Sequence, residues 1–514
     1  FLVSMKRSRV DIGLSKEQYA DDESKDEVTH GFGQHAKASD EVMRGRRVVK
    51  AVVASTRLTE LKRHTYALNQ SFYQGIKLQS SQNAKESWLE NMKEYLSYAQ
   101  EIDGRYGDHR GVLLTFGSGD CGQLGHGVEE DIDMCVKFPR PVQALSMHRI
   151  ARVACGGLHT MALTHEGSVF TWGCNDDGAL GRIGDENLPG QVTGFPEGTT
   201  IVTIVGGDCH TTAVAVDGSV FTWGSYKDKE GKLWCDGPSP NDTFKKKQLT
   251  PYLVPTLANV VDVKSGSSHN LARCADGHVY SWGLGEMGNL GRPVSTEIRD
   301  AHGEYKLSVV FNDHLTPQLV KLNGKPFGCK ALGAGSYHSL FVANDSGGIY
   351  SCGLNNYGQL GLGHDVNQTE LQLVEALGSK NGLFVEGGTH HSVVLVTDGT
   401  LYTFGRGDSG QLGTLDDPGT GAFKDSPQEI KVPGVTGFRA VACGSNHALA
   451  VTDQDAIYSW GYGDMLALGN GVEKDELKPR RIDWTKTKFG AAKILQVAAG
   501  GQHSAVVAEK ATTT

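Results

Sequence analysis

Histidine and cysteine are the residues in this sequence whose chemistry depends most on spacing. The ten cysteines are scattered along 514 residues and none forms a Cys-x-x-Cys pair, so neither a zinc site nor a thioredoxin-like site is indicated. A nucleophile elbow and a zincin motif are also absent from the sequence. We therefore expect no hydrolytic or metal enzyme and no cofactor. Seven histidines recur at regular spacing: His159, His210, His269, His338, His390, His447 and His503.

A charged segment offers a different chemistry, that of binding. Residues 225–234 read Ser-Tyr-Lys-Asp-Lys-Glu-Gly-Lys-Leu-Trp, with four charges in succession before a glycine. This pattern predicts a protruding hairpin. Loops that interrupt a repeat often carry a binding function on a rigid scaffold, although a solvated insertion without a role fits the pattern equally well. A second insertion, Pro293–Asn312, lengthens the following part of the chain.

Both features lie within an internal repeat. An aromatic residue followed by glycine recurs about every 50 to 70 residues, beginning at Phe116, Trp172, Trp223, Trp282, Phe404 and Trp460, with Cys352 in the same place once. Each repeat histidine follows a small-residue turn and precedes alternating apolar residues and a second turn, which is a β-hairpin signal. Most repeats also contain Gly-x-Leu-Gly, which the charged segment replaces.

A repeat of this length made of strands and turns predicts one blade of a β-propeller. The expected fold class is therefore all-β, a seven-bladed ring over residues 111–508 with a short tail at 509–514. Ring closure should pair the strand at 112–116 with strands near the C-terminus, which removes an open sheet edge. We expect the tryptophans to pack blades together and most repeat histidines to be satisfied structurally. Histidines spread around a ring cannot share one metal ion.

The composition of the chain limits its structural class, its partners and its cellular compartment. The chain has 67 glycines but only 15 prolines, which is typical of many tight turns. A net charge of −9 argues against the whole chain coating nucleic acid. No apolar run approaches the roughly 18 residues of a membrane span, and no secretory signal is present, so a reducing cytosol or nucleus fits best. Because the sequence begins with Phe1, we expect a fragment, with Met5 a plausible natural start.

The N-terminal extension differs from the repeats. Residues 1–54 lack periodicity and carry basic clusters at 6–9 and 44–47, which predicts a disordered charged tail. Such clusters fit importin-type recognition or DNA phosphates, and solvated charge is the alternative. Within 55–110, apolar residues at helical spacing predict two amphipathic helices. A pair this short rarely folds alone, so we expect it to dock on another surface.

The repeat resembles that of the regulator-of-chromosome-condensation family. Phe170–Arg182 (FTWGCNDDGALGR) looks like the second blade of the family's Ran exchange factors, and Trp223–Leu233 falls where these factors carry the β-wedge that they insert against Ran. The resemblance covers nearly all of 111–508. It implies a guanine-nucleotide exchange factor for the small GTPase Ran, without covalent chemistry, located in the nucleus and bound to chromatin through histones or DNA.

The resemblance also implies which residues contact Ran. The matching positions are Asp120, Asp208, Asn356 and His390, with Arg292 and His503 as further candidates. The wedge would consist of Tyr226, Lys227, Asp228, Lys229, Glu230, Gly231 and Lys232. One position departs from the family, which typically has an acidic residue before the third blade's histidine. Ser268 stands there, before His269, and would weaken one contact or transfer it to a neighbour.

Part of the extension resembles another protein class. Lys37–Met43, Leu68–Ser71 and Lys93–Leu96 look like the N-terminal region of the fifty-kilodalton nuclear-basket nucleoporin that binds importin-α. This resemblance implies importin-α as a partner and a targeting or docking arm at 1–110.

Two other functions compete with exchange. A propeller that acts only as an interaction scaffold in nuclear transport remains the alternative. An ultraviolet-sensing propeller of this repeat type would need tryptophans clustered beside the repeat histidines, and the preceding residues here include neither tryptophan nor arginine.

Overall fold

The computed structural model describes residues 111–127, 134–236, 245–295, 297–487, 489–490 and 492–510. The predicted charged tail at 1–54 and the predicted helical segment at 55–110 lie outside these residues. The basic clusters and the segments that resemble the nucleoporin lie outside them too. The last strand continues to Lys510, so the tail expected from residue 509 begins later than predicted.

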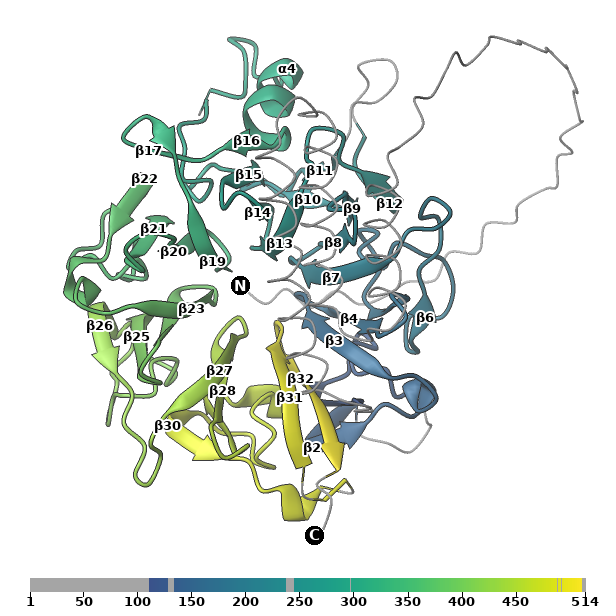
Figure 1. Ribbon diagram of the computed structural model, residues 1–514, viewed down its shortest axis with the longest axis vertical. Coiled ribbons are helices and arrows are strands. Elements are labelled where there is room, and N and C mark those ends of the chain that lie inside the picture. Colours follow the sequence, from purple (N-terminus) through teal and green to yellow (C-terminus); the bar gives the residue numbers. More distant parts are fainter. Residues whose placement is uncertain are drawn as a thin grey trace, which may run out of the picture. The chain divides into compact units, whose positions relative to one another are not determined.

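The described residues form seven four-stranded antiparallel sheets arranged around a centre, which confirms the predicted propeller (Figure 1). Blade one contains β31 (Ala492–Ala499), β32 (His503–Lys510), β1 (Val112–Ser118) and β2 (Cys135–Pro141). Blade two contains β3 (Ile150–Cys155), β4 (His159–Thr164), β5 (Val169–Gly173) and β6 (Gly190–Gln191). Blade three contains β7 (Ile201–Gly206), β8 (His210–Ala215), β9 (Val220–Gly224) and β12 (Gln248–Leu253).

The other four blades repeat this order from the inner to the outer strand. Blade four contains β13 (Val260–Ser265), β14 (His269–Cys274), β15 (Val279–Gly283) and β16 (Gln318–Leu319). Blade five contains β19 (Cys329–Ala334), β20 (His338–Ala343), β21 (Ile349–Gly353) and β22 (Gln368–Leu373). Blade six contains β23 (Gly382–Gly387), β24 (His391–Val396), β25 (Leu401–Arg406) and β26 (Phe423–Glu429). Blade seven contains β27 (Phe438–Cys443), β28 (His447–Thr452), β29 (Ile457–Gly461) and β30 (Glu476–Arg481).

Shorter elements lie between the blade strands. Two small hairpins are formed by β10 (Tyr226–Lys227) with β11 (Leu233–Trp234) and by β17 (Lys321–Leu322) with β18 (Lys325–Pro326). The helical turns are η1 (Gln143–Leu145), α4 (Leu307–Val309), η2 (Val310–Leu315), η3 (Glu375–Leu377), η4 (Asp464–Leu466) and η5 (Trp484–Lys486). The second insertion contains α4 and the first half of η2.

Ring closure joins the two ends of the repeat region. Strand β1 pairs antiparallel with β32, from Val112 opposite Ala508 to Gly117 opposite His503. The yellow strands β31 and β32 therefore lie in the same blade as the blue strand β2 in Figure 1, with β1 between β32 and β2. This pairing confirms the predicted closure and leaves blade one built from both ends of the repeat region.

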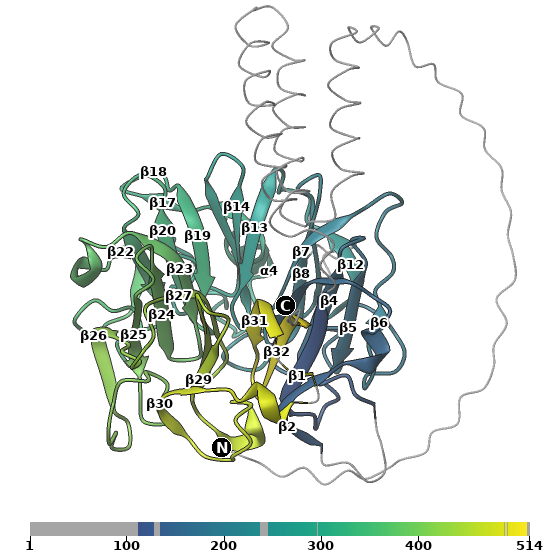
Figure 2. The same cartoon turned by 60° about the horizontal axis from the view of Figure 1, so that its bottom comes forward.

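A circle of backbone hydrogen bonds joins the turns between the first and second strands of successive blades. The N–H of Gly157 donates to Gly207 O, and the N–H of Asp208 donates to Ser267 O, both at 3.1 Å. The circle continues from Ser267 to Ser336, Ser336 to Gly388, Thr389 to Ser445, Ser445 to Gly500 and Gly501 to Gly157, at 2.8–3.2 Å. Every one of the seven seams thus has one such bond. Figure 2 shows β19, β23, β27 and β31 following one another around the inside of this ring.

The repeat histidines connect the same seams through their side chains. Each ring packs against the glycine three residues earlier: a Cβ at Gly207 would lie 2.1 Å from His210 Cε1, so only glycine fits. In six blades, Nε2 then bonds to a polar side chain of the next blade at 2.7–3.0 Å. The prediction of structural histidines is confirmed, with one correction. The sixth member is His391, which is buried and begins β24, whereas His390 occupies the preceding turn position.

The repeat tryptophans pack between blades, as predicted. Trp172, Trp223, Trp282 and Trp460 are at most 1% exposed. The indole N–H of Trp223 donates to Ala179 O of the preceding blade at 2.8 Å. Gly181 in that blade has φ +64°, and a Cβ there would lie 2.7 Å from the indole. The Gly-x-Leu-Gly turn is therefore the surface on which the next blade's tryptophan rests.

The inner strands enclose an axial channel of about 720 Å³. Its lining is mixed in charge: the Lys264 ammonium on β13 pairs with the Glu386 carboxylate on β23, which joins blade four to blade six. Arg152 and Asp262 also line the channel. A channel with such a lining is unlike the mostly apolar pockets that hold small organic ligands.

The seam between blades six and seven departs from the others. Where the other blades have serine, threonine or asparagine after the repeat histidine, blade seven has Ala448. Nε2 of His391 consequently lacks the hydrogen bond that the other six rings make, although the side chain is buried. Burial lowers the pKa of His391 to about 3, so the ring is neutral at pH 7.

We predict that Ala448→Ser stabilises the propeller, because the new hydroxyl can accept from His391 and repeat the bond of the other seams. The expected gain in the free energy of unfolding is about 1 kcal/mol, measured from urea denaturation midpoints. Ala450→Ser on the same buried strand is the matched control. It places a hydroxyl among apolar residues and should destabilise the protein. Equal destabilisation by both changes would contradict the prediction.

Candidate functional site

One face of the propeller carries most of the predicted binding residues. In each blade the first residue of the second strand pairs with the last glycine of the third strand, as with His210 and Gly224 or His391 and Gly405. The turn before the histidine and the loop after the aromatic-Gly pair therefore lie at the same end of every blade. The charged hairpin follows Gly224 directly and belongs to this end, which we call the loop face.

Four of the six predicted contact residues reach the surface of the loop face. Asp120, Asp208 and Asn356 are exposed, and His390 is half-buried. Asp120 and Asn356 lie in loops after the third strand in blades one and five. Asp208 and His390 lie in the inner turns of blades three and six. Acidic, amide and imidazole groups are thus distributed over a broad surface, which suits a macromolecular partner better than a small molecule.

Asp208 combines exposure with an unusual environment. Packing of the neighbouring turns around its carboxyl group raises its pKa, and a hydrogen bond from Ser267 and the charge of Lys227 oppose this shift. Because Lys227 begins the charged hairpin, the hairpin and Asp208 share one electrostatic environment. A cation of a partner that reached Asp208 would therefore also meet the hairpin.

His390 is held by an aromatic and charged cluster. The ring centroids of Tyr357 and His390 are 5.0 Å apart, and Arg406 lies over the Tyr357 ring at 5.2 Å. Asp408 accepts two hydrogen bonds from the Arg406 guanidinium, each at 2.8 Å. Burial lowers the pKa of His390, and the Arg406 charge lowers it further, so the ring is neutral at pH 7.

The structure places the two remaining candidates beneath the surface. His503 is 0% exposed, and its Nε2 lies 2.7 Å from Thr160 Oγ1 in the next blade. Arg292 is 6% exposed and donates to Asp313 O at 2.8 Å and to Ser281 O at 3.2 Å. Both side chains support the loop face from inside the propeller. A direct contact with a partner stays a prediction for them.

The charged segment forms the predicted hairpin, which exposes Lys227 and most of its tip at 229–232. Tyr226 pairs with Trp234 and Lys227 with Leu233. The Asp228 carboxylate accepts from the N–H groups of Glu230 at 3.0 Å and Lys232 at 2.8 Å, which closes the turn. Lys227, Lys229, Glu230 and Gly231 face solvent, whereas Tyr226, Asp228 and Trp234 are at most 7% exposed.

The base of the hairpin is fixed to the blades by polar contacts. The Tyr226 hydroxyl donates to Asp236 Oδ2 at 2.6 Å and accepts from Asn270 Nδ2 at 2.8 Å. Burial raises the pKa of Asp236 to about 6, opposed by hydrogen bonds from Thr222 and Tyr226. Tyr226 was predicted as a wedge residue. Its side chain is buried and anchors the base of the hairpin, so it does not lie on the exposed surface.

Ser268 has a specific role at this base. Its hydroxyl accepts from the Lys227 N–H and donates to the Lys227 carbonyl, each at 3.0 Å. A carboxylate in this place could accept from the N–H group but could not donate to the carbonyl. The family resemblance implied an acidic residue at this position. Ser268, which stands there instead, therefore holds the hairpin to blade four through both hydrogen bonds.

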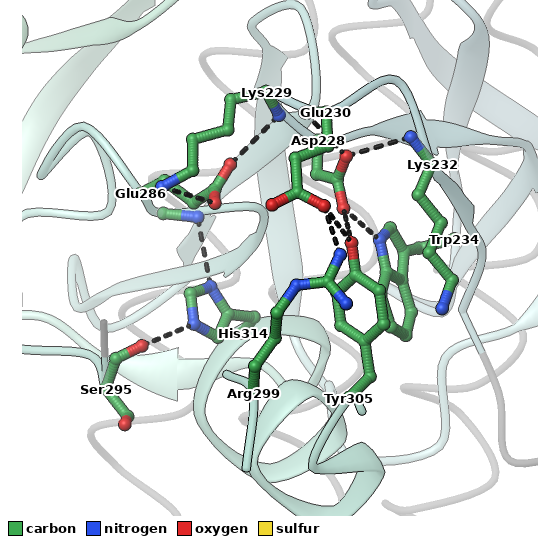
Figure 3. Close-up of polar contacts among 11 residues, drawn as sticks. Asp228, Lys229, Glu230, Lys232, Trp234, Glu286, Ser295, Arg299, Tyr305 and His314 are labelled. Carbon is green, nitrogen blue, oxygen red and sulfur yellow. Dashed lines mark hydrogen bonds and ion pairs between the residues drawn. The ribbon is translucent and has the colours of Figure 1, made fainter. Parts of the chain in front are cut away.

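The second insertion supports the hairpin from the side (Figure 3). Tyr305 and Arg299 of the insertion contact Asp228 and Glu230. These two insertion residues were missed from the sequence, although the insertion itself was noticed. Its length was the available signal, but spacing along the chain could not show that it folds back on the hairpin.

Two further features were sought in the part of the chain that the structure describes: a metal-binding site and a membrane-spanning helix. Within it, no group of three or more histidine, cysteine, aspartate or glutamate side chains is placed to hold a metal ion. No helix among the described residues is long and apolar enough to cross a bilayer.

Comparison with known proteins identifies the family. The family model of the RCC1-like domain matches residues 112–506. The chain is 33% identical over 414 residues to the regulator of chromosome condensation of Xenopus laevis, covering 79% of this chain and 91% of the relative. It is 31% identical over 442 residues to the guanine nucleotide exchange factor SRM1 of Saccharomyces cerevisiae, covering 76% and 86%. The chain therefore belongs to the RCC1-like propeller family.

A solved structure agrees with this assignment. Prp20p of Saccharomyces cerevisiae, described with its binding to Gsp1p and histones, superposes with a TM-score of 0.70 at 29% identity, covering 80% of this chain and 95% of Prp20p. The family also includes the ultraviolet-B receptor UVR8 of Arabidopsis thaliana, 32% identical over 381 residues, covering 72% of this chain and 78% of the receptor. Membership in the family alone therefore does not decide the activity.

We predict that Ser268→Ala loosens the hairpin base without unfolding the propeller. The change leaves the N–H and carbonyl of Lys227 without their partner, so the Lys227 amide should exchange with deuterium about tenfold faster, equivalent to about 1.4 kcal/mol. Ser445→Ala, in the inner turn of blade seven, is the control and should leave this amide unchanged. Unaltered deuterium exchange at Lys227 in Ser268→Ala would show that the two hydrogen bonds of Ser268 do not stabilise the base of the hairpin.

Proposed function

We propose that this protein is a guanine-nucleotide exchange factor for the small GTPase Ran, acting in the nucleus on chromatin. The observation that carries the proposal is the charged hairpin on the loop face, which has a fixed base, an exposed tip and, in Lys227, a charge close to Asp208. Similarity to a curated exchange factor and to a propeller studied with Gsp1p and histones supports it.

The mechanism needs no covalent step. A small GTPase holds its nucleotide through backbone amides and a lysine of its phosphate loop and through a magnesium ion. In the proposal, the tip at 229–232 presses on this phosphate-binding region, while Asp208 offers the GTPase cations an alternative anion. Each contact promotes release only if it is stronger when the nucleotide is absent. The cellular ratio of GTP to GDP then decides which nucleotide rebinds.

The other loop-face residues would position Ran. Asp120 and Asn356 offer polar contacts on blades one and five, and His390 offers a neutral imidazole on blade six. His503 and Arg292 would act indirectly, by holding the turns on which these contacts depend. The scaffold alternative keeps all these contacts but predicts that nucleotide release is unchanged.

Histones, DNA and importin-α are proposed as further partners. The similarity to Prp20p supports histones. Importin-α rests on the sequence of the extension at 1–110, which we propose as a targeting arm separate from the exchange site. Pull-down of importin-α by the full chain, but not by a chain beginning at residue 111, is the expected result.

The central prediction is that the full chain accelerates release of fluorescently labelled GDP from Ran but not from an unrelated small GTPase. Release is followed under an excess of unlabelled nucleotide, so that rebinding does not contribute. Binding to Ran without acceleration would favour the scaffold function. Equal acceleration on both GTPases would contradict the assigned specificity.

We predict that Asp208→Asn lowers exchange on Ran about tenfold or more, because a charge-assisted contact is lost while side-chain shape is kept. The thermal midpoint of unfolding should change little. Asp217→Asn is the matched control, since it removes the same charge from an exposed turn at the opposite end of blade three. Normal turnover in Asp208→Asn would remove Asp208 from the site.

A further inference from the structure

The second insertion and the charged hairpin share a small core. Tyr226 and Trp234 of the hairpin are buried together with Val310 of the insertion, Leu315 just after it and Leu284 of blade four. Tyr305 packs against this core, with its ring centroid 4.9 Å from that of Trp234. The hairpin therefore does not stand alone on blade three. It packs against the insertion, which lies between the third and fourth strands of blade four.

A polar contact extends this support to the tip. The Tyr305 hydroxyl lies 3.0 Å from Asp228 Oδ2 and 3.0 Å from Glu230 Oε2 (Figure 3). Burial raises the pKa of Tyr305 well above its ordinary value, and the two carboxylates raise it further, so the hydroxyl keeps the proton that it donates. Asp228 closes the turn, whereas Glu230 is at the exposed tip. One hydroxyl thus links the buried turn residue of the hairpin to its exposed tip.

Cations complete the cluster around the same ring. Lys232 Nζ lies 3.4 Å from the Tyr305 ring centroid, and Arg299 Cζ lies 3.8 Å from it. Arg299 also pairs with the Glu230 carboxylate. On the other side of the turn, the Lys229 N–H donates to Glu286 Oε2 at 3.1 Å. The tip residues Lys229, Glu230 and Lys232 are consequently each held by a group from blade four or its insertion.

The cluster around Tyr305 contributes little to the stability of the folded propeller. Ion pairs at exposed positions contribute little to the free energy of unfolding, because water competes and salt screens them. What such contacts do change is the number of conformations open to a short loop. A loop that is ordered before binding loses less entropy on contact, so more of the contact energy is available to displace a partner's groups.

We propose that Tyr305, assisted by Arg299, is the positioning residue of the hairpin: it holds the tip at 229–232 in the conformation that enters the GTPase. This inference rests on the proposed exchange function, which it deepens. Tyr305 touches no nucleotide and no reacting group. Its effect passes through Asp228 and Glu230, and the hairpin and the insertion act as one rigid unit.

The test uses the full chain and two measurements. Tyr305→Phe keeps the ring beneath Lys232 and Arg299 and removes only the hydroxyl, whereas Tyr305→Ala removes both. Tyr458→Phe, on β29 in blade seven, is the matched control for the hydroxyl. Glu297→Gln, at an exposed position of the same insertion, controls for altering the insertion itself.

The first measurement needs no partner. Deuterium exchange of the amides at 229–232 should quicken about fivefold in Tyr305→Phe and more than tenfold in Tyr305→Ala, as one or more contacts to the carboxylates are lost. Trypsin cleavage after Lys229, followed by mass spectrometry, should rise in the same order. Both controls should match the unaltered chain. Unchanged protection of the tip in Tyr305→Ala would overturn the proposal.

The second measurement separates positioning from binding. On Ran, kcat for GDP release should fall about fivefold in Tyr305→Phe and further in Tyr305→Ala, while KM stays within about twofold, because the broad face still binds Ran. A loosened tip with normal kcat would overturn the proposal. If the unaltered chain fails to accelerate release, the proposed exchange function fails. The protection measurement then still decides whether Tyr305 orders the tip.

Discussion

The circle of hydrogen bonds between the inner turns is the interaction on which the rest of the propeller depends. One backbone N–H in each seam donates to a carbonyl of the following turn, and the series closes from Gly501 back to Gly157. The repeat histidines reinforce the same seams from one layer below. Because the circle joins every pair of neighbouring blades at the inner turns, it sets the spacing of the loops on the loop face.

The same circle places the candidate site. Asp208 donates its own N–H to Ser267 while its carboxyl group faces solvent, so a structural bond fixes the position of a binding residue. His390 lies in an equivalent turn of blade six. The binding surface is therefore not an addition to the propeller but the outer side of its seams. Rigidity at the seams is what allows a short hairpin to act on a partner.

The hairpin illustrates how a repeat acquires a function. Blade three lacks the Gly-x-Leu-Gly turn, and the chain instead forms a turn closed by Asp228. Without that turn, the segment is held in place by other groups. Ser268 and the insertion of blade four supply the missing support. Two departures from the repeat, far apart in sequence, thus compensate for each other in space.

The sequence by itself determined the fold class, the number of blades, the closure by β1 and the existence of the hairpin, because each follows from a local pattern that recurs or visibly fails to recur. The family resemblance also pointed to Asp120, Asp208 and Asn356, which the structure shows to be exposed. The sequence could not separate His390 from His391, since both fit the turn pattern and only burial distinguishes them. Nor could it show that Arg292 and His503 lie inside, or that Tyr305 meets Asp228. Those facts depend on which segments pack together across blades, and no local pattern records a contact between residues that are 77 positions apart.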